Sequence, residues 1–294
     1  MTASSDLPYP PFELADRVSS LPSNDFSGFV LYEIRGRELH QQLLSMLPEG
    51  YSFEGRSVLD FGCGAGRTLR HFHDDAATAR FVGCDIDGQS IDWLRENMSP
   101  PFEVFQSEVD PPLPLEEGTF DFIWAVSVFS HLSDNSAAWL LELRRLLKPD
   151  GLLMASYMGK FNSELLAREE WDEDRIGMNV LRHNQDWDEG GPSVFMSDWW
   201  VDEHWGRAFS IEDRVDFHGQ TWTLLRKSGG LMSVEELLAP GSDPREFAAL
   251  RHNLAQVQAE LEEQKEISTG LRRELDLPLK IRLRRRLGMS WQDQ

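Results

Sequence analysis

Three glycines at alternating positions follow a short apolar run in the first quarter of the chain. The run is VLDF, residues 58–61, and Gly62, Gly64 and Gly66 come directly after it. Glycine lets backbone amides approach a ligand closely, and a helix that opens beyond the glycines adds a favourable dipole. The pattern predicts a strand that ends in a ligand-binding loop.

Two carboxylates accompany this loop. Asp60 lies two positions before Gly62, and Asp85 lies 19 residues after Gly66, at the end of a second apolar run. A carboxylate in the second position can hold the two hydroxyls of a ribose. Asp60 would repel a pyrophosphate but attract an ammonium group. The spacing is also GxGxG rather than the GxGxxG of dinucleotide-binding loops.

A ligand with a ribose, an ammonium group and no phosphate therefore fits better than a nicotinamide dinucleotide, and S-adenosylmethionine is such a ligand. The alternatives are a glycine turn without a ligand in an ordinary α/β domain and an NAD-dependent oxidoreductase.

The elements around these residues alternate between strand and helix patterns. Between Ser57 and Leu153, short apolar runs alternate with amphipathic stretches, which is typical of a doubly wound parallel sheet. Two later runs, residues 209–217 and 220–227, are separated only by His218 and Gly219. They predict a hairpin that closes the sheet.

Residues 45–227 resemble the class I S-adenosylmethionine-dependent methyltransferases. The resemblance rests on VLDFGCGAG, VGCDID, LPLEEGTFDFIWAVSVFSHL and the LKPDG turn at 147–151. It implies an α/β fold with a Rossmann-like, mostly parallel seven-stranded sheet and a C-terminal antiparallel hairpin. The SVFSHL segment is similar to a subgroup that modifies sugars, polysaccharides and natural products.

The resemblance also implies roles for individual residues. Asp60 and the three glycines would surround the methionine part of S-adenosylmethionine, Asp85 would hold the ribose, and Ile86 would pack on adenine. Relatives often carry Asp after the third strand, where this chain has Ser107-Glu108, so Glu108 or a backbone group would meet the adenine amine. Ser127, after the fourth strand, completes the expected cofactor-binding set.

His131 is the candidate catalytic residue. It follows the fourth strand, where this fold places the open side of the methyl donor, and it could act as a base or position the acceptor. The alternative is that it caps a helix starting near Ser133 or orients the loop. His183, His204 and His218 are expected to have packing or surface roles, and Tyr32 and Arg35 are candidates to close the pocket.

Composition and motifs narrow the function class. The 29 Lys and Arg against 50 Asp and Glu give a net charge of −21, which disfavours nucleic acid as a substrate. Asp110-Pro111-Pro112-Leu113 precedes the fourth strand, whereas the base-stacking motif of DNA amino-methyltransferases follows it. No metal is expected, because Ser127 stands where catechol-type relatives need an Asp. The expected function is methyl transfer to a hydroxyl or amine of a sugar or another small molecule, with a non-catalytic interaction protein of this fold as the alternative.

The whole chain is expected to divide into five parts. Residues 1–25 are expected to be a poorly ordered lead-in with one short helix, and residues 26–227 the catalytic domain. This domain includes a Trp-rich cap insert at 160–206. Its tryptophans either stack on the acceptor or pack within the insert. Residues 228–243 read as a linker. Residues 244–275 carry apolar side chains at seven of nine heptad a and d positions, interrupted by Gln264 and Ser268, and predict a coiled coil that makes a homo-oligomer.

The basic tail, residues 276–294, ends the chain. Residues 271–294 together carry a net +4, which leaves −25 for the remainder. This asymmetry predicts contact of the tail with a membrane surface or an acidic partner, or with the chain's own body. No secretory signal and no apolar run of about 20 residues is present, so a cytoplasmic location is expected.

Overall fold

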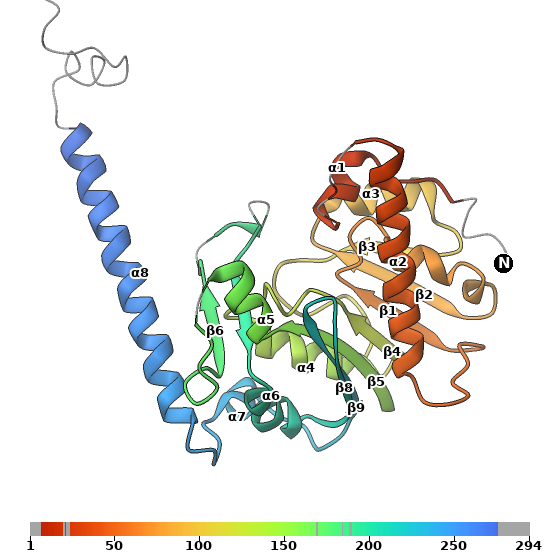
Figure 1. Cartoon of the computed structure of the whole chain (residues 1–294). Coiled ribbons are helices and arrows are strands. Elements are labelled where there is room, and N and C mark those ends of the chain that lie inside the picture. Colours follow the sequence, from red (N-terminus) through yellow and green to blue (C-terminus); the bar gives the residue numbers. More distant parts are fainter. Residues whose placement is uncertain are drawn as a thin grey trace, which may run out of the picture.

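One central sheet organises the molecule (Figure 1). The computed structural model describes residues 7–19, 21, 24–168, 170–183, 185–187 and 190–275. The strands are β1 (Ser57–Phe61), β2 (Arg80–Asp85), β3 (Glu103–Gln106), β4 (Phe120–Ala125), β5 (Leu147–Met158), β6 (Met178–Leu181), β7 (Ser193–Met196), β8 (Phe209–Phe217) and β9 (Gln220–Lys227).

The strand order confirms the expected mostly parallel sheet. Strands β3, β2, β1, β4 and β5 are parallel neighbours, β9 pairs antiparallel with β5, and β8 pairs antiparallel with β9. These seven strands, including the hairpin around His218 and Gly219, match the prediction. The described residues contain two further strands, because β6 and β7 form a hairpin inside the 160–206 segment and meet β5 at Met158 and Phe195. That segment has no clear alternation in its sequence, so its strands were not predicted.

Helices cover both faces of the sheet, as the apolar runs require, since strands buried on both faces have no polar side. On one face lie α2 (Phe26–Met46) and α3 (Gly88–Asn97), which bury Leu43 and Leu94. On the other face lies α4 (Ser136–Leu146), which buries Trp139 and Leu140. The other helices are α1 (Phe12–Arg17), α5 (Lys160–Asn162), α6 (Asp198–His204), α7 (Val234–Leu238) and α8 (Glu246–Leu275).

The segment that leads into α2 packs more closely than the lead-in expected for residues 1–25. Within it, α1 buries Leu14 and Ala15, and Ala15 clusters with Tyr32 of α2. The segment is held by hydrogen bonds from three arginines, described below, which the local sequence does not reveal.

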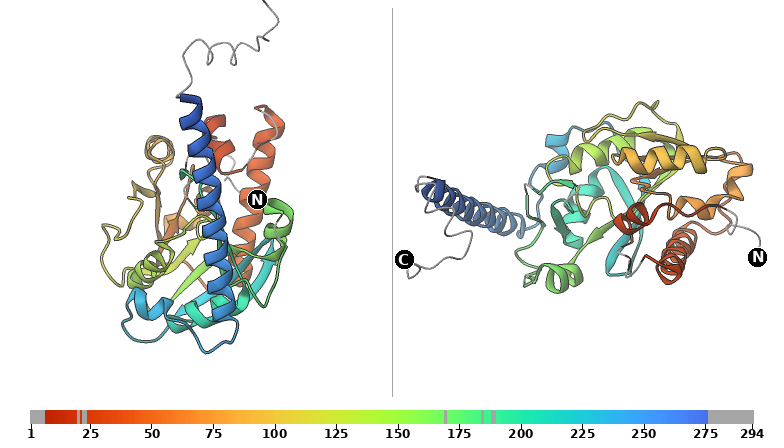
Figure 2. Two further views of the ribbon diagram at one scale, coloured as in Figure 1. Left: turned by 90° about the vertical axis from the view of Figure 1, so that its left-hand side faces the viewer. Right: turned by 90° about the horizontal axis from the view of Figure 1, so that it is seen from above.

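The stretch expected to be a linker, residues 228–243, contains a short packed helix. Ser233 and Glu236 form a capping box at the start of α7, and Leu237 is buried against the core. Beyond it, α8 projects from one side of the body, as Figure 1 and the right-hand view of Figure 2 show. The helix predicted over 244–275 is therefore present. No helix in the described part of the chain has both the length and the apolarity needed to cross a bilayer.

Candidate active site

The candidate residues gather at the carboxyl edge of the parallel strands. In the sheet register, Asp60 of β1 pairs with Gly83 of β2 and with Trp124 of β4, and Asp85 pairs with Gln106 of β3. Because the strands are parallel, the loops that follow β1, β2, β3 and β4 emerge side by side. This edge is where open α/β sheets bind their ligands.

The glycines have the left-handed backbone expected of them, but the helix expected beyond them is only a short 3-10 helix, Leu69–Phe72. Gly62, Gly64 and Gly66 have φ of 80°, 50° and 77°, in the left-handed region that favours glycine. A Cβ atom at Gly62 would lie 2.4 Å from the side chain of Val128, and one at Gly64 would lie 2.5 Å from Val18. Side chains at these positions would strain the backbone and displace their neighbours.

Asp85 is fixed against this loop. The Gly64 amide donates to Asp85 Oδ2 at 2.7 Å, and the Asp87 amide donates to Oδ1 at 2.9 Å. Burial raises the pKa of Asp85 above its usual value, against the opposing effect of these amides. The carboxylate thus faces the loop from the end of β2, as its proposed ribose-binding role requires.

Asp60 is the more deeply buried of the two carboxyl groups, at 3% exposed. Its Oδ2 has no hydrogen-bond partner among the residues that the structure describes. Burial is the main cause that raises the pKa of Asp60 to about 8. An unpartnered buried carboxyl oxygen beside a glycine loop suits the ammonium group of a ligand, so these residues fit S-adenosylmethionine.

The adenine-side candidates differ in burial. The Ser107 side chain is buried, and its amide donates to the Asp85 carbonyl at 2.9 Å. Glu108 is exposed, while Ile86 is half-buried and its carbonyl accepts from Gln106 Nε2 at 3.0 Å. Of the Ser107-Glu108 pair, Ser107 is the residue with a described hydrogen bond to the end of β2 that carries Asp85.

Ser127 belongs to a polar ring that the sequence did not predict. Its φ is 59°, and its amide donates to Ser156 Oγ at 2.7 Å. Ser156 Oγ donates to Gln220 Oε1 at 2.6 Å, and Gln220 Nε2 donates to Ser127 Oγ at 3.0 Å. Ser156 and Gln220 carry no sequence signal, because only the pairing of β5 with β9 brings them to the end of β4.

His131 lies in the loop after β4 with one ring nitrogen engaged. Nδ1 is 3.0 Å from the Pro192 carbonyl oxygen. A carbonyl can only accept, so Nδ1 carries the proton and Nε2 keeps its lone pair. Desolvation is the main cause that lowers the pKa of His131. The helix-capping alternative is not seen, since α4 begins at Ser136 with Asn135 at its N-cap.

The other histidines are paired elsewhere. His183 Nε2 lies 2.9 Å from Asp134 Oδ1. His218, exposed in the β8–β9 turn, lies 3.3 Å from Glu38 of α2. His204 is buried against Glu246 at 2.7 Å. These contacts agree with the expected packing and surface roles.

The tryptophans of the 160–206 insert mostly pack. Trp199, Trp200 and Trp205 are buried, and Trp205 lies against Phe129. Trp187 is exposed, and its backbone borders Gly191, which also neighbours His131. Of these four, only Trp187 is exposed.

An N-terminal strap, residues 7–19, crosses the glycine loop. Arg67 donates to the Val18 carbonyl and Arg35 to the Ser19 carbonyl, while Arg70 donates to the Leu7 carbonyl at 2.8 Å. Arg17 of the strap forms an ion pair of 2.7 Å with Asp87.

Tyr32, expected to close the pocket, is fully buried and donates to the Ala65 carbonyl at 3.1 Å. Tyr32 thus contacts the glycine loop, and Arg35 contacts the strap. No pattern in the sequence predicts the strap, because arginines of other elements hold it through its backbone carbonyls.

Comparisons with known proteins agree with this geometry. Residues 58–151 match the family model of a methyltransferase domain. A 2-methyl-6-phytyl-1,4-hydroquinone methyltransferase of Synechocystis sp. is 29% identical over 121 residues, which cover 40% of this chain and 37% of that protein. A malonyl-[acyl-carrier protein] O-methyltransferase of Halalkalibacterium halodurans is 29% identical over 130 residues, 42% of this chain and 48% of that protein.

The match spans less than half the length of these two curated relatives. Among solved structures, an S-adenosylmethionine-dependent methyltransferase from Mesorhizobium loti aligns with a TM-score of 0.49 at 16% identity, covering 64% of this chain and 96% of that one. The expected fold and the expected cofactor, S-adenosylmethionine, are confirmed for the domain that holds the glycine loop.

Proposed function

We propose that this chain, whose residues 58–151 match the family model of a methyltransferase domain, is a class I S-adenosylmethionine-dependent methyltransferase that transfers a methyl group to a hydroxyl or amine of a sugar or another small molecule. The observation that carries the proposal is the site after β1: three left-handed glycines beside Asp85 and a buried Asp60 oxygen that has no partner among the described residues. The expected setting is polysaccharide or natural-product biosynthesis.

The chain's residues have separate tasks in this proposal. S-adenosylmethionine supplies a sulfonium-bound methyl group that a nucleophile can displace in line. Asp60 binds the ammonium end, Asp85 binds the ribose hydroxyls, and Ile86 with Ser107 borders adenine. Most of the acceleration comes from holding the acceptor in line within a site that excludes water.

His131 handles the proton. His131 Nε2, the ring nitrogen that the Pro192 contact leaves with a lone pair, would accept the hydroxyl proton of the acceptor, while the methyl–sulfur bond would break with its electron pair left on sulfur. The lowered pKa keeps this nitrogen unprotonated near neutral pH. An acceptor that is already ionised needs only positioning by the same ring.

The acceptor class rests on charge and on the surface near His131. A net charge of −21 repels phosphate backbones, which argues against DNA and RNA. The exposed ring of Trp187 offers an aromatic face of the kind that stacks on sugars or flat aglycones. One of the matched relatives is named as an O-methyltransferase, in line with an oxygen acceptor here.

The direct test is methyl transfer from labelled S-adenosylmethionine to a panel of glycans, nucleotide sugars, aglycones and tRNA. We expect product from at least one small molecule, and none with the Asp85→Ala variant. Activity on tRNA alone would contradict the acceptor class. Cofactor binding without transfer to any acceptor would favour the non-catalytic alternative.

Two further expectations stay proposals. A cytoplasmic location and contact of the basic tail with a membrane surface or an acidic partner rest on sequence alone. The tail, residues 276–294, lies outside the described residues.

A further inference from the structure

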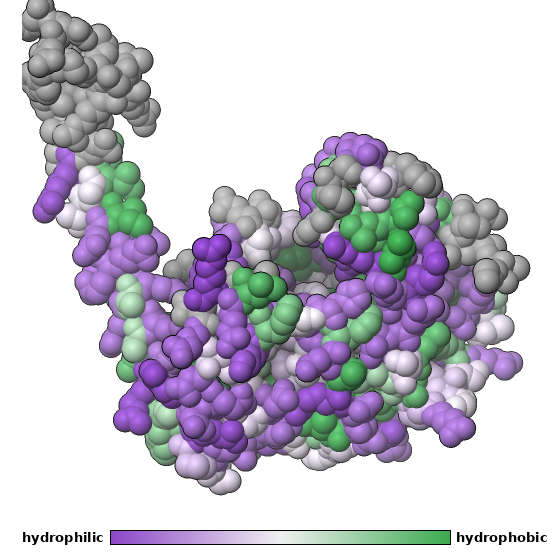
Figure 3. All heavy atoms as spheres, in the orientation of Figure 1, coloured by the Kyte–Doolittle hydropathy of each residue, from purple (hydrophilic) through white to green (hydrophobic). Residues whose placement is uncertain are grey.

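An apolar stripe runs along α8 and is exposed to solvent. Its members stand at heptad a and d positions and are between 48% and 68% exposed: Phe247, Leu250, Leu254, Val257, Leu261, Leu271 and Leu275. Figure 3 shows green side chains recurring along this helix as it leaves the body. Water covers these apolar side chains, which Gln264 and Ser268 interrupt, and this exposure is unfavourable unless another surface buries them.

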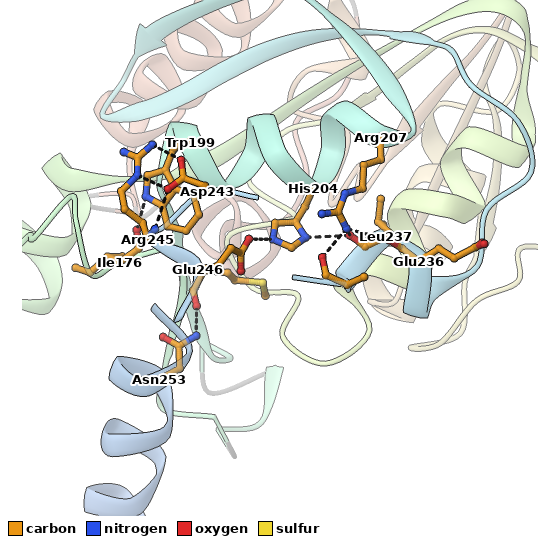
Figure 4. A network of polar contacts seen from close by, with 12 residues as sticks. Ile176, Trp199, His204, Arg207, Glu236, Leu237, Asp243, Arg245, Glu246 and Asn253 are labelled. Atoms are coloured by element: carbon orange, nitrogen blue, oxygen red, sulfur yellow. Dashed lines mark hydrogen bonds and ion pairs between the residues drawn. The ribbon is translucent and has the colours of Figure 1, made fainter. Parts of the chain in front are cut away.

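The body holds only the first turns of α8. His204 Nε2 lies 2.7 Å from Glu246, Ala249 is buried, and Asn253 donates to the Met178 carbonyl at 2.6 Å (Figure 4). From Leu254 to Leu275 the helix is about 33 Å long and has no comparable anchor to any residue that the structure describes. In proteins, most of the stability of a helix comes from packing of its apolar face, and this part of α8 buries no such face against the body.

The charges that flank the stripe favour one arrangement of two such helices. The e positions hold Arg251, Lys265 and Arg272, whereas Glu260 occupies a g position. In a parallel, in-register pair, each g residue faces the e residue of the next heptad on the partner helix. Glu260 of one copy then lies opposite Lys265 of the second copy. An antiparallel pair would instead bring e positions together and oppose like charges.

We propose that α8 pairs with α8 of a second copy of this chain, as a parallel, in-register coiled coil over residues 254–275. Gln264 and Ser268 then face their own counterparts in adjacent layers, which specifies the register at some loss of affinity. Both catalytic bodies lie at the same end of the coiled coil. This proposal is independent of the proposed enzymatic function.

Light scattering of the full chain tests the pairing. We expect a dimeric mass, and a monomeric mass for Leu254→Glu combined with Leu261→Glu. The matched control, Ala255→Glu with Ala259→Glu, adds the same charges at exposed positions outside the stripe and should remain dimeric. A monomeric wild type, or a dimer that survives the stripe substitutions, overturns the proposal.

Cysteine cross-linking tests the orientation. Both natural cysteines are buried, so the background is low. Leu271→Cys, at a d position near the end of the helix, should form a disulfide-linked dimer on mild oxidation, while Thr269→Cys should not. A dimeric Leu271→Cys variant that does not cross-link would show an antiparallel pair and contradict the proposal.

A charge exchange tests the register. Lys265→Glu should raise the dimer Kd about fivefold. In the symmetric dimer, Glu260 of each copy would then face a carboxylate at position 265 of the other copy. Adding Glu260→Lys should restore the affinity in a parallel pair. Failure of this rescue, measured by sedimentation equilibrium, would exclude the proposed register.

Discussion

The carboxyl group of Asp60 carries a clear energetic signature of a binding site. Its burial raises the pKa to about 8, from an ordinary value of 3.8. Between pH 3.8 and about pH 8, Asp60 therefore keeps its proton in the folded protein and loses it in the unfolded chain. The free energy of unfolding falls as the pH rises through this range. A ligand ammonium group would offset this cost, because it stabilises the ionised form.

The Asp60→Asn variant should therefore gain stability relative to wild type with rising pH. The free-energy difference should be smallest near pH 4, grow up to about pH 8, and stay constant above. Between pH 5 and pH 8.5 it should change by more than about 1.4 kcal/mol, the equivalent of one pKa unit. Urea unfolding at the two pH values measures it, and a pH-independent difference would contradict the assigned burial cost.

His131 should affect the rate more than cofactor binding. We expect His131→Ala to lower kcat about 100-fold with an acceptor that must lose a proton, and to leave S-adenosylhomocysteine affinity unchanged. The wild-type kcat should fall with decreasing pH as Nε2 becomes protonated, below the usual histidine range because the pKa is lowered. His218→Ala, exposed in the β8–β9 turn, is the control. Equal losses in both variants would remove His131 from the proton-transfer role.

Secondary elements show where sequence patterns suffice and where they fail. The short apolar runs predicted the five parallel strands β1 to β5 and the β8–β9 hairpin, because such runs reflect burial within a sheet. They missed β6 and β7, whose pairing depends on contact with β5 rather than on local pattern. The polar ring of Ser127, Ser156 and Gln220 was missed for the same reason, as its members are up to 93 residues apart.

The N-terminal strap was likewise not predictable from the sequence, because the hydrogen bonds that hold it are accepted by its backbone carbonyl groups. Its Leu7, Val18 and Ser19 carbonyls accept from arginines of other elements. Any residue type supplies a carbonyl, so neither composition nor periodicity marks these contacts. Only the folded chain shows that residues 7–19 lie over the glycine loop.

Loosening the strap should weaken the cofactor site. Arg17→Ala removes the ion pair with Asp87, two residues from Asp85, and we expect the Kd for S-adenosylhomocysteine to rise about threefold. The matched control is Arg95→Ala, which removes an exposed ion pair of the same 2.7 Å length to Asp92 on α3. Equal Kd values for Arg17→Ala and wild type would show that the strap does not cover the bound ligand.

The whole molecule separates a catalytic body from an extended helix. The body holds the sheet, the strap and every candidate site residue, whereas α8 contacts it mainly through its first two turns (Figure 4). Cofactor binding should therefore be independent of the free part of α8.

A chain ending at Gln256 should keep its S-adenosylhomocysteine affinity within about twofold, because the anchoring contacts of Glu246 and Asn253 remain and additivity holds for distant sites. Its mass by light scattering should be that of a monomer. A large loss of affinity would mean that the second copy contributes to the site.

Calorimetric titration with S-adenosylhomocysteine tests the central claim most directly. The account predicts saturable one-to-one binding to the wild type and at least a tenfold weaker Kd for Asp85→Ala, since that variant loses the acceptor for the ribose hydroxyls and the anchor of the Gly64 amide. Asp92→Ala, an exposed carboxylate on α3, should bind like wild type. No binding to the wild type, or undiminished binding to Asp85→Ala, would contradict the account.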